Sequence, residues 1–154
     1  MQNVSGNVRK NHNGNKVNRM CNLKVYSDTN SFKSFAKTTK IPVYSVHDKC
    51  ENGNWQTDNR ISFDVSDKDW SDFDGQVQDC IGFLTKYFEE IEQLFKTHKI
   101  TTAYLDFPIY SRLYGDIVNQ NDHLPKELIQ LAGKLSLGIE MAIYTKDAFD
   151  RNEE

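Results

Sequence analysis

Apolar side chains recur at steps of three and four residues between Phe73 and His98. This spacing is typical of one face of an α-helix, and a segment of this length makes about seven turns. The stripe consists of Phe73, Val77, Cys80, Ile81, Leu84, Tyr87, Phe88, Ile91, Leu94, Phe95 and His98. Polar residues, Gln76 among them, take the opposite positions and are expected to face water. So long a stripe predicts that the helix lies on a large apolar surface, such as a sheet.

Short alternating segments on both sides of this helix predict the strands of that sheet. They lie near residues 23–26, 43–46, 61–65, 103–109 and 139–143. A turn signal at residues 51–54 indicates a hairpin between the second and third strands, with Trp55 near its tip or covering an edge. Pro108 has no N–H to donate, so we expect it to mark the end of its strand or a sheet edge.

Two shorter helices complete the expected order of elements. One lies near residues 32–36 and ends before Pro42, and the other begins at Pro125 and is closed by Gly138. The order β-α-β-β-α-β-α-β predicts an α+β fold, with a mixed, mostly antiparallel sheet of about five strands and helices mainly on one face. The last two strands could form a parallel pair. A doubly wound parallel sheet fits less well, because no glycine-rich phosphate loop follows any strand.

The length of 154 residues suits one domain. Residues 1–19 contain four basic residues, no acid and many asparagines, and we interpret them as a disordered basic tail. Residues 20–146 are predicted to form a single α+β domain, followed by a frayed polar C-terminus at 147–154.

Charge is distributed unevenly around the net value of −3. Beyond the tail the chain has 15 basic and 22 acidic residues, which argues against nucleic-acid binding and favours a basic protein partner. No apolar run is long enough for a membrane span or resembles a secretory signal, so we predict a cytoplasmic protein without membrane contact. Three widely spaced cysteines do not indicate a disulfide framework.

Five acids precede and begin the long helix: Asp64, Asp67, Asp69, Asp72 and Asp74. A calcium loop with Gly75 at its sixth position would place Trp70 first and Ile81 twelfth, where oxygen ligands are required. We therefore expect Asp72 or Asp74 to cap the helix and the nearby acids to favour its positive end. A partner-binding acidic patch or a weak cation site is the alternative.

Metal, cofactor and nucleophile signals are weak. His47 and Cys50 stand three apart, but a closed zinc site needs four ligands and no second pair lies nearby. No local motif marks an activated thiol next to a histidine. We therefore predict no metal, no cofactor and no catalytic residue.

The most site-like residues lie on one strand and the long polar loop that follows it: Tyr104, Asp106, Tyr110, Arg112, Tyr114, Asp116 and His123. Tyrosine and arginine are favoured interface anchors, and loops after strands often bind or catalyse. In the alternative interpretation the strand face is merely solvated, and Leu113 and Tyr114 pin the loop. We favour partner binding over catalysis, with these candidates: Asp67, Asp69, Asp72, Asp106, Tyr110, Arg112 and Tyr114.

Three segments carry a resemblance: residues 61–66 with Trp70 and Asp72, residues 105–107, and Leu124–Leu131 followed by Leu137–Tyr144. Together they resemble an uncharacterised group of small bacterial proteins over roughly Leu23 to Tyr144. The resemblance implies one α+β domain. Some small acidic proteins of this kind look like immunity proteins, which bind and block bacterial toxins.

Three functions remain open. The first is a non-catalytic cytosolic binding protein, such as an immunity protein. The second is a small-molecule enzyme that uses the strand-end loop 106–123 and gathers Asp106, Arg112 and His123 in one pocket. The third is a structural, self-associating domain, and the sequence leaves the oligomeric state open.

Overall fold

Five strands and three helices make up the part of the chain that the computed structural model describes, residues 20–50 and 57–147. In chain order they are β1 (Cys21–Ser27), α1 (Lys33–Thr38), β2 (Val43–His47), β3 (Asn59–Ser66), α2 (Phe73–Thr97), β4 (Thr102–Tyr110), α3 (Lys126–Lys134) and β5 (Gly138–Tyr144). This confirms the predicted α+β fold and the predicted order. The basic tail, the turn with Trp55 and nearly all of the polar C-terminus lie outside the described residues.

The strands form one mixed sheet in the order β2-β3-β1-β4-β5. The pairs β2–β3, β3–β1 and β1–β4 are antiparallel, and the first of them is the predicted hairpin pair. The last pair, β4 and β5, is parallel because α3 connects the two strands. The doubly wound alternative is therefore wrong.

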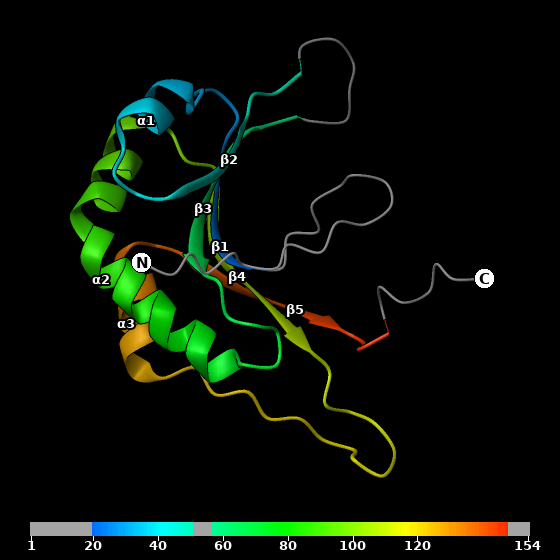
Figure 1. Cartoon of the computed structure of the whole chain (residues 1–154). Coiled ribbons are helices and arrows are strands. Elements are labelled where there is room, and N and C mark those ends of the chain that lie inside the picture. Colours follow the sequence, from blue (N-terminus) through cyan, green and yellow to red (C-terminus); the bar gives the residue numbers. More distant parts are fainter. Residues whose placement is uncertain (1–19, 51–56, 148–154) are drawn as a thin grey trace, which may run out of the picture.

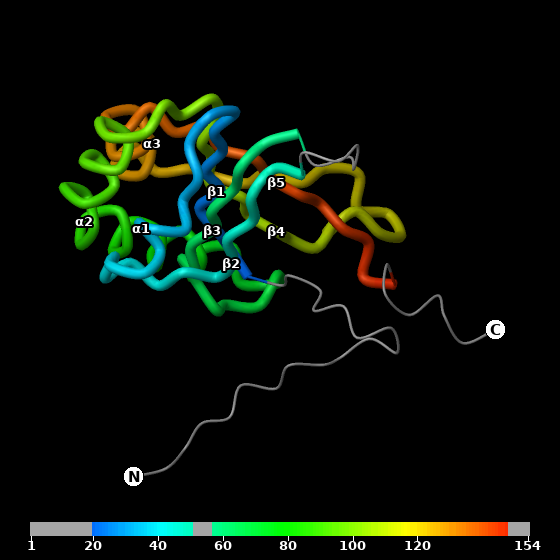
Figure 2. Tube along the Cα trace, turned by 90° about the horizontal axis from the view of Figure 1, so that it is seen from above, coloured from blue at the N-terminus to red at the C-terminus, as the bar shows by residue number. Residues whose placement is uncertain are grey.

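All three helices cover the same face of the sheet (Figures 1 and 2). Successive side chains of a strand point to opposite faces, so every second strand residue enters the core under the helices. The strand residues buried there include Leu23, Val25, Ile61, Phe63, Leu105 and Phe107. The apolar stripe of α2 meets them through Val77, Cys80, Leu84, Ile91 and Leu94. The opposite face, called here the open face, has no helix of the described chain over it.

The buried side of α2 is wider than its apolar stripe. Gln76 is fully buried, so the prediction that it faces water is wrong. Its Nε2 donates hydrogen bonds to the carbonyl oxygens of Pro108, at 2.9 Å, and Asp69, at 3.2 Å. Phe83, which is not part of the stripe, is also buried, with its ring 5.1 Å from that of Tyr87. A polar side chain can replace an apolar one at such a position because backbone carbonyls are its partners.

Pro108 lies inside β4 and not at its end. The pairing of β4 with β1 stops at Asp106 and Asn22, whereas its pairing with β5 continues to Tyr110. Beyond that point the segment before α2 replaces β1, since the N–H of Tyr110 donates to the carbonyl of Trp70 at 3.1 Å. Pro108 therefore occupies a local edge, where its missing N–H breaks no ladder bond.

Replacing Gln76 with Leu should lower the free energy of unfolding by about 1–2 kcal/mol, because it leaves the buried carbonyl of Pro108 without its donor. Urea unfolding followed by circular dichroism measures this loss. Gln78→Leu is the matched control, since Gln78 is exposed on the same helix. Equal stability of the two variants would contradict the role assigned to Gln76.

The turn between α3 and β5 lies at a different residue from the one predicted. Gly138 does not close the helix; Ser136 has the positive φ, of 55°, and Gly138 begins β5. A Cβ atom at Gly138 would lie 3.3 Å from the Cβ of Tyr104 on β4. The glycine thus allows close approach of two strands, and the turn lies two residues earlier.

Candidate functional site

The acids before α2 mainly organise their own segment. Asp72 is the N-cap of α2, and its Oδ1 accepts a hydrogen bond from the N–H of Gly75 at 2.9 Å. A Cβ at Gly75 would meet the Asp72 carboxylate, so any larger residue there would displace this carboxylate from its present position. Asp69 Oδ1 accepts from the N–H and Oγ of Ser71. The expected cap at Asp72 is confirmed, and Asp67 is exposed next to it.

Tyr110, a predicted binding residue, belongs to an aromatic cluster with Trp70 and Tyr144. The Trp70 ring is stacked on Tyr144, with centroids 4.5 Å apart, and lies 5.2 Å from the ring of Tyr110. Trp70 is only 4% exposed. The cluster joins the segment before α2 to the ends of β4 and β5, so Tyr110 has a packing role.

Arg112 ties together the two ends of the loop at residues 111–124. Its Nη2 donates to Asp122 Oδ1 at 2.7 Å and to the carbonyl of Asn121 at 3.1 Å. The backbone N–H of Arg112 donates to Gln120 Oε1, and Gln120 Nε2 donates in turn to Asp122 Oδ2. The Asp122 side chain is 10% exposed, which strengthens the ion pair by limiting contact with water. This network gives the loop a defined shape where it extends beyond the sheet (Figure 1).

Four apolar or aromatic side chains of this loop face solvent. Leu113 is 52% exposed, Tyr114 61%, Ile117 45% and Val118 90%; we call these four the loop surface. Leu113 and Tyr114, which in the alternative interpretation pin the loop, are thus both more than half exposed. Sequence reasoning missed Ile117 and Val118, although two adjacent apolar residues in a polar loop were a visible signal.

A hollow of about 390 Å³ lies between the start of the loop and the end of β5. Its walls are Ser111, Leu113, Tyr114, Thr145, Lys146 and Asp147. The Lys146 ammonium lies 5.3 Å from the centre of the Tyr114 ring, a cation–π distance. The hollow therefore combines an aromatic wall with a positive charge.

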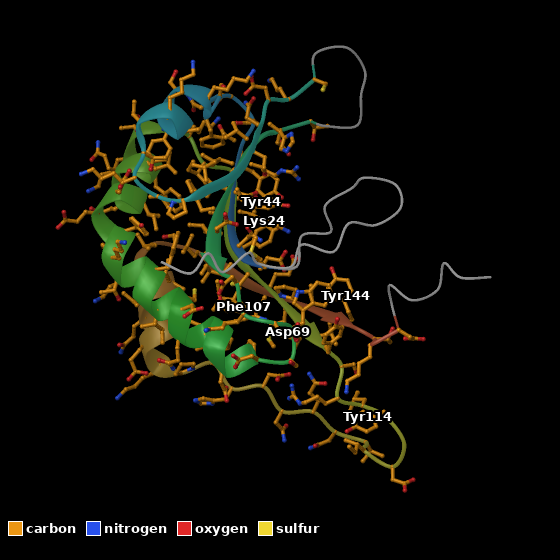
Figure 3. The ribbon with its side chains drawn as sticks, in the orientation of Figure 1. Lys24, Tyr44, Asp69, Phe107, Tyr114 and Tyr144 are labelled. Carbon is orange, nitrogen blue, oxygen red and sulfur yellow. The ribbon has the colours of Figure 1, made fainter. Side chains whose placement is uncertain are left out.

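Asp106 lies apart from the loop, on the open face. Lys24 Nζ forms an ion pair with Asp106 Oδ2 at 2.5 Å and lies 5.7 Å from the Tyr104 ring. The hydroxyls of Tyr104 and Tyr26 are 3.4 Å apart. Burial, aided by this contact with Tyr26, raises the pKa of Tyr104 well above its usual range, so the phenol stays neutral. Figure 3 shows Lys24 on the sheet and Tyr114 far out on the loop.

The predicted binding residues thus separate into four places. Asp67, Asp69 and Asp72 lie before α2, and Asp106 lies on the open face. Arg112 and Tyr114 lie on the loop, and Tyr110 lies in the aromatic cluster. The proposed catalytic grouping has no support in these contacts, because Asp106 pairs with Lys24 and Arg112 with Asp122.

Metal and thiol chemistry find little basis in the described residues. Within them, no three or more His, Cys, Asp or Glu side chains are grouped so that they could hold a metal ion. Burial, together with its contact with Cys80, raises the pKa of Cys21 well above its usual value, which keeps the thiol protonated and a poor nucleophile.

No helix in the described ranges has both the length and the apolar character needed to cross a bilayer. Comparison of the chain with protein-family models, with curated proteins and with solved structures found no match. The geometry of the loop surface is therefore the basis for a functional interpretation.

Proposed function

We propose that the protein is a non-catalytic binding protein and that the loop surface is the centre of its binding site. The observation that carries this proposal is the exposure of Val118, 90% accessible, beside three other exposed apolar or aromatic residues on one loop. Single exposed apolar residues are common on protein surfaces, but a group of them on one loop is typical of an interaction site.

The arrangement of the loop favours binding in a second way. Arg112, Gln120 and Asp122 hold its ends before any partner is present. A preformed loop loses less conformational entropy on binding than a flexible one, so more of the contact energy appears as affinity. Tyr114 adds a rigid aromatic side chain of the kind that dominates interface energetics.

We further propose a basic protein as the partner, and a toxin as the specific case, which would make this chain an immunity protein. The excess of acidic residues beyond the first 19 supports a basic partner. Asp67 near the start of α2 and Asp116 on the loop are exposed and could attract it. Blocking a toxin requires contact and no chemistry, which fits a site made of apolar side chains.

Val118→Asp should abolish capture of the partner, because it places a charge at the most exposed apolar position of the loop surface. The experiment compares proteins retained from a lysate of the source organism by the full chain, by Val118→Asp and by Ile129→Asp. Ile129 is the matched control, since it is 46% exposed on α3 and outside the loop surface. The proposal requires a protein that is retained by the full chain and by Ile129→Asp but is not retained by Val118→Asp.

The partner class is tested by the same captured protein. A basic toxin that loses activity at an equimolar ratio, and that associates more slowly as salt rises, supports the immunity role. A partner retained equally by Val118→Asp would overturn the assignment of the loop surface, and a captured acidic protein would overturn the charge argument.

A further inference from the structure

The two edge strands of the sheet differ in how well they are protected from pairing. Edge strands expose unpaired backbone groups, and proteins commonly blunt them with bulges, charges or short length. β2 has five residues and an irregular register between Val43 and Ser45, and Asp48 and Lys49 follow it. β5 has seven residues, pairs with β4 in unbroken register, and contains no proline and one charged side chain, Glu140.

The backbone geometry of β5 identifies which groups its outer edge presents. The N–H of Ser111, next to β4, donates to the carbonyl of Tyr144 at 2.7 Å, so the backbone groups of Tyr144 face β4. Because backbone N–H and C=O groups alternate in direction along a strand, those of Ile139, Met141 and Ile143 face away from β4. No strand of the described chain lies on that side of β5.

We propose that the outer edge of β5 pairs antiparallel with β5 of a second copy of this chain, about a two-fold axis beside Ile143. In this register Ile143 lies opposite Ile143 of the other copy and exchanges two backbone hydrogen bonds with it. Met141 lies opposite Thr145, the residue after β5, and the two sheets become one continuous sheet.

Side-chain chemistry selects this register. Glu140 and Lys146, both exposed, lie opposite each other twice across the axis, and opposite charges in cross-strand pairs are stabilising. Ile143, 58% exposed in the single chain, is covered by its own copy. Centring the axis on Met141 or Ala142 would place Glu140 opposite Ala142 or Tyr144 and lose both ion pairs.

Charge reversal tests the proposal without a change to the core. Sedimentation velocity of the full chain over a wide concentration range measures the dimer dissociation constant. Glu140→Lys and Lys146→Glu should each weaken the dimer about tenfold, because each creates two like-charge pairs. The double variant should return the constant to near the original value. Ile143→Lys should abolish the dimer, and Ile129→Lys, on α3, should leave it unchanged.

A chain that stays monomeric at every concentration overturns the proposal. So does a dimer that neither single reversal weakens, one that the double variant does not restore, or one that Ile129→Lys also breaks. None of these measurements involves another protein, so a negative result would overturn the dimer without bearing on the proposed partner-binding function.

Discussion

Trp70→Ala should lower the free energy of unfolding by about 3–5 kcal/mol, the range expected when a buried tryptophan is cut back to alanine. Trp70 is buried, and its indole ring packs against the rings of both Tyr110 and Tyr144. Its removal would leave a cavity where the segment before α2 meets the ends of β4 and β5. Urea unfolding followed by far-ultraviolet circular dichroism measures the effect.

Trp70→Phe serves as the control, because it keeps an aromatic ring against Tyr144 and should cost about half as much or less. If Trp70→Ala unfolded at the same urea concentration as the original chain, the aromatic cluster would contribute nothing to stability and the prediction would be wrong. A large loss in both variants would indicate that the indole itself, and not ring packing, is required.

Asp106→Ala should lower the free energy of unfolding by about 2–3 kcal/mol. The reason is that the Lys24 ammonium, in a mostly buried position, loses the carboxylate with which it is paired. The side chains of Lys24 and Asp106 are 22% and 14% exposed, so the effect should be smaller than for a fully enclosed pair. Lys24→Met should be destabilising for the same reason, since the Asp106 carboxylate then lacks its cation.

The double variant Lys24→Met with Asp106→Leu completes the cycle. Removing both charges removes both unpaired groups, so its stability should lie within about 1 kcal/mol of the original chain. Losses that simply add in the double variant would show that the two residues do not interact, and would contradict the ion pair on the open face.

The elements themselves were predictable because they depend on local periodicity. The three-and-four spacing from Phe73 to His98 and the alternation around Leu23, Ile61 and Leu105 each specify an element without reference to the rest of the chain. The cap at Asp72 was predictable for the same reason, since the N-cap carboxylate and the N–H that donates to it, that of Gly75, lie within one turn.

The candidate site was harder to predict, because proximity in sequence does not determine which surface a side chain reaches. Asp106 and Arg112 are six residues apart, yet one is paired with Lys24 on β1 and the other with Asp122. Tyr110 and Tyr114 differ in the same way: one packs on Trp70 and the other faces solvent. Composition suggested a binding loop, but only the fold distinguished its packing residues from its exposed ones.

The sequence by itself therefore determined the type and order of the elements and the covered face of the sheet. Tertiary structure decided how far each strand extends beside its neighbour. The pairing of β1 with β4 stops at Asn22 and Asp106, before it reaches Pro108. This leaves room for Gln76 to reach the Pro108 carbonyl and for Trp70 to lie against β4, and it makes a proline acceptable inside a strand. How far one strand extends beside its neighbour depends on pairing between residues far apart in the chain. A local pattern of apolar and polar residues does not predict this pairing.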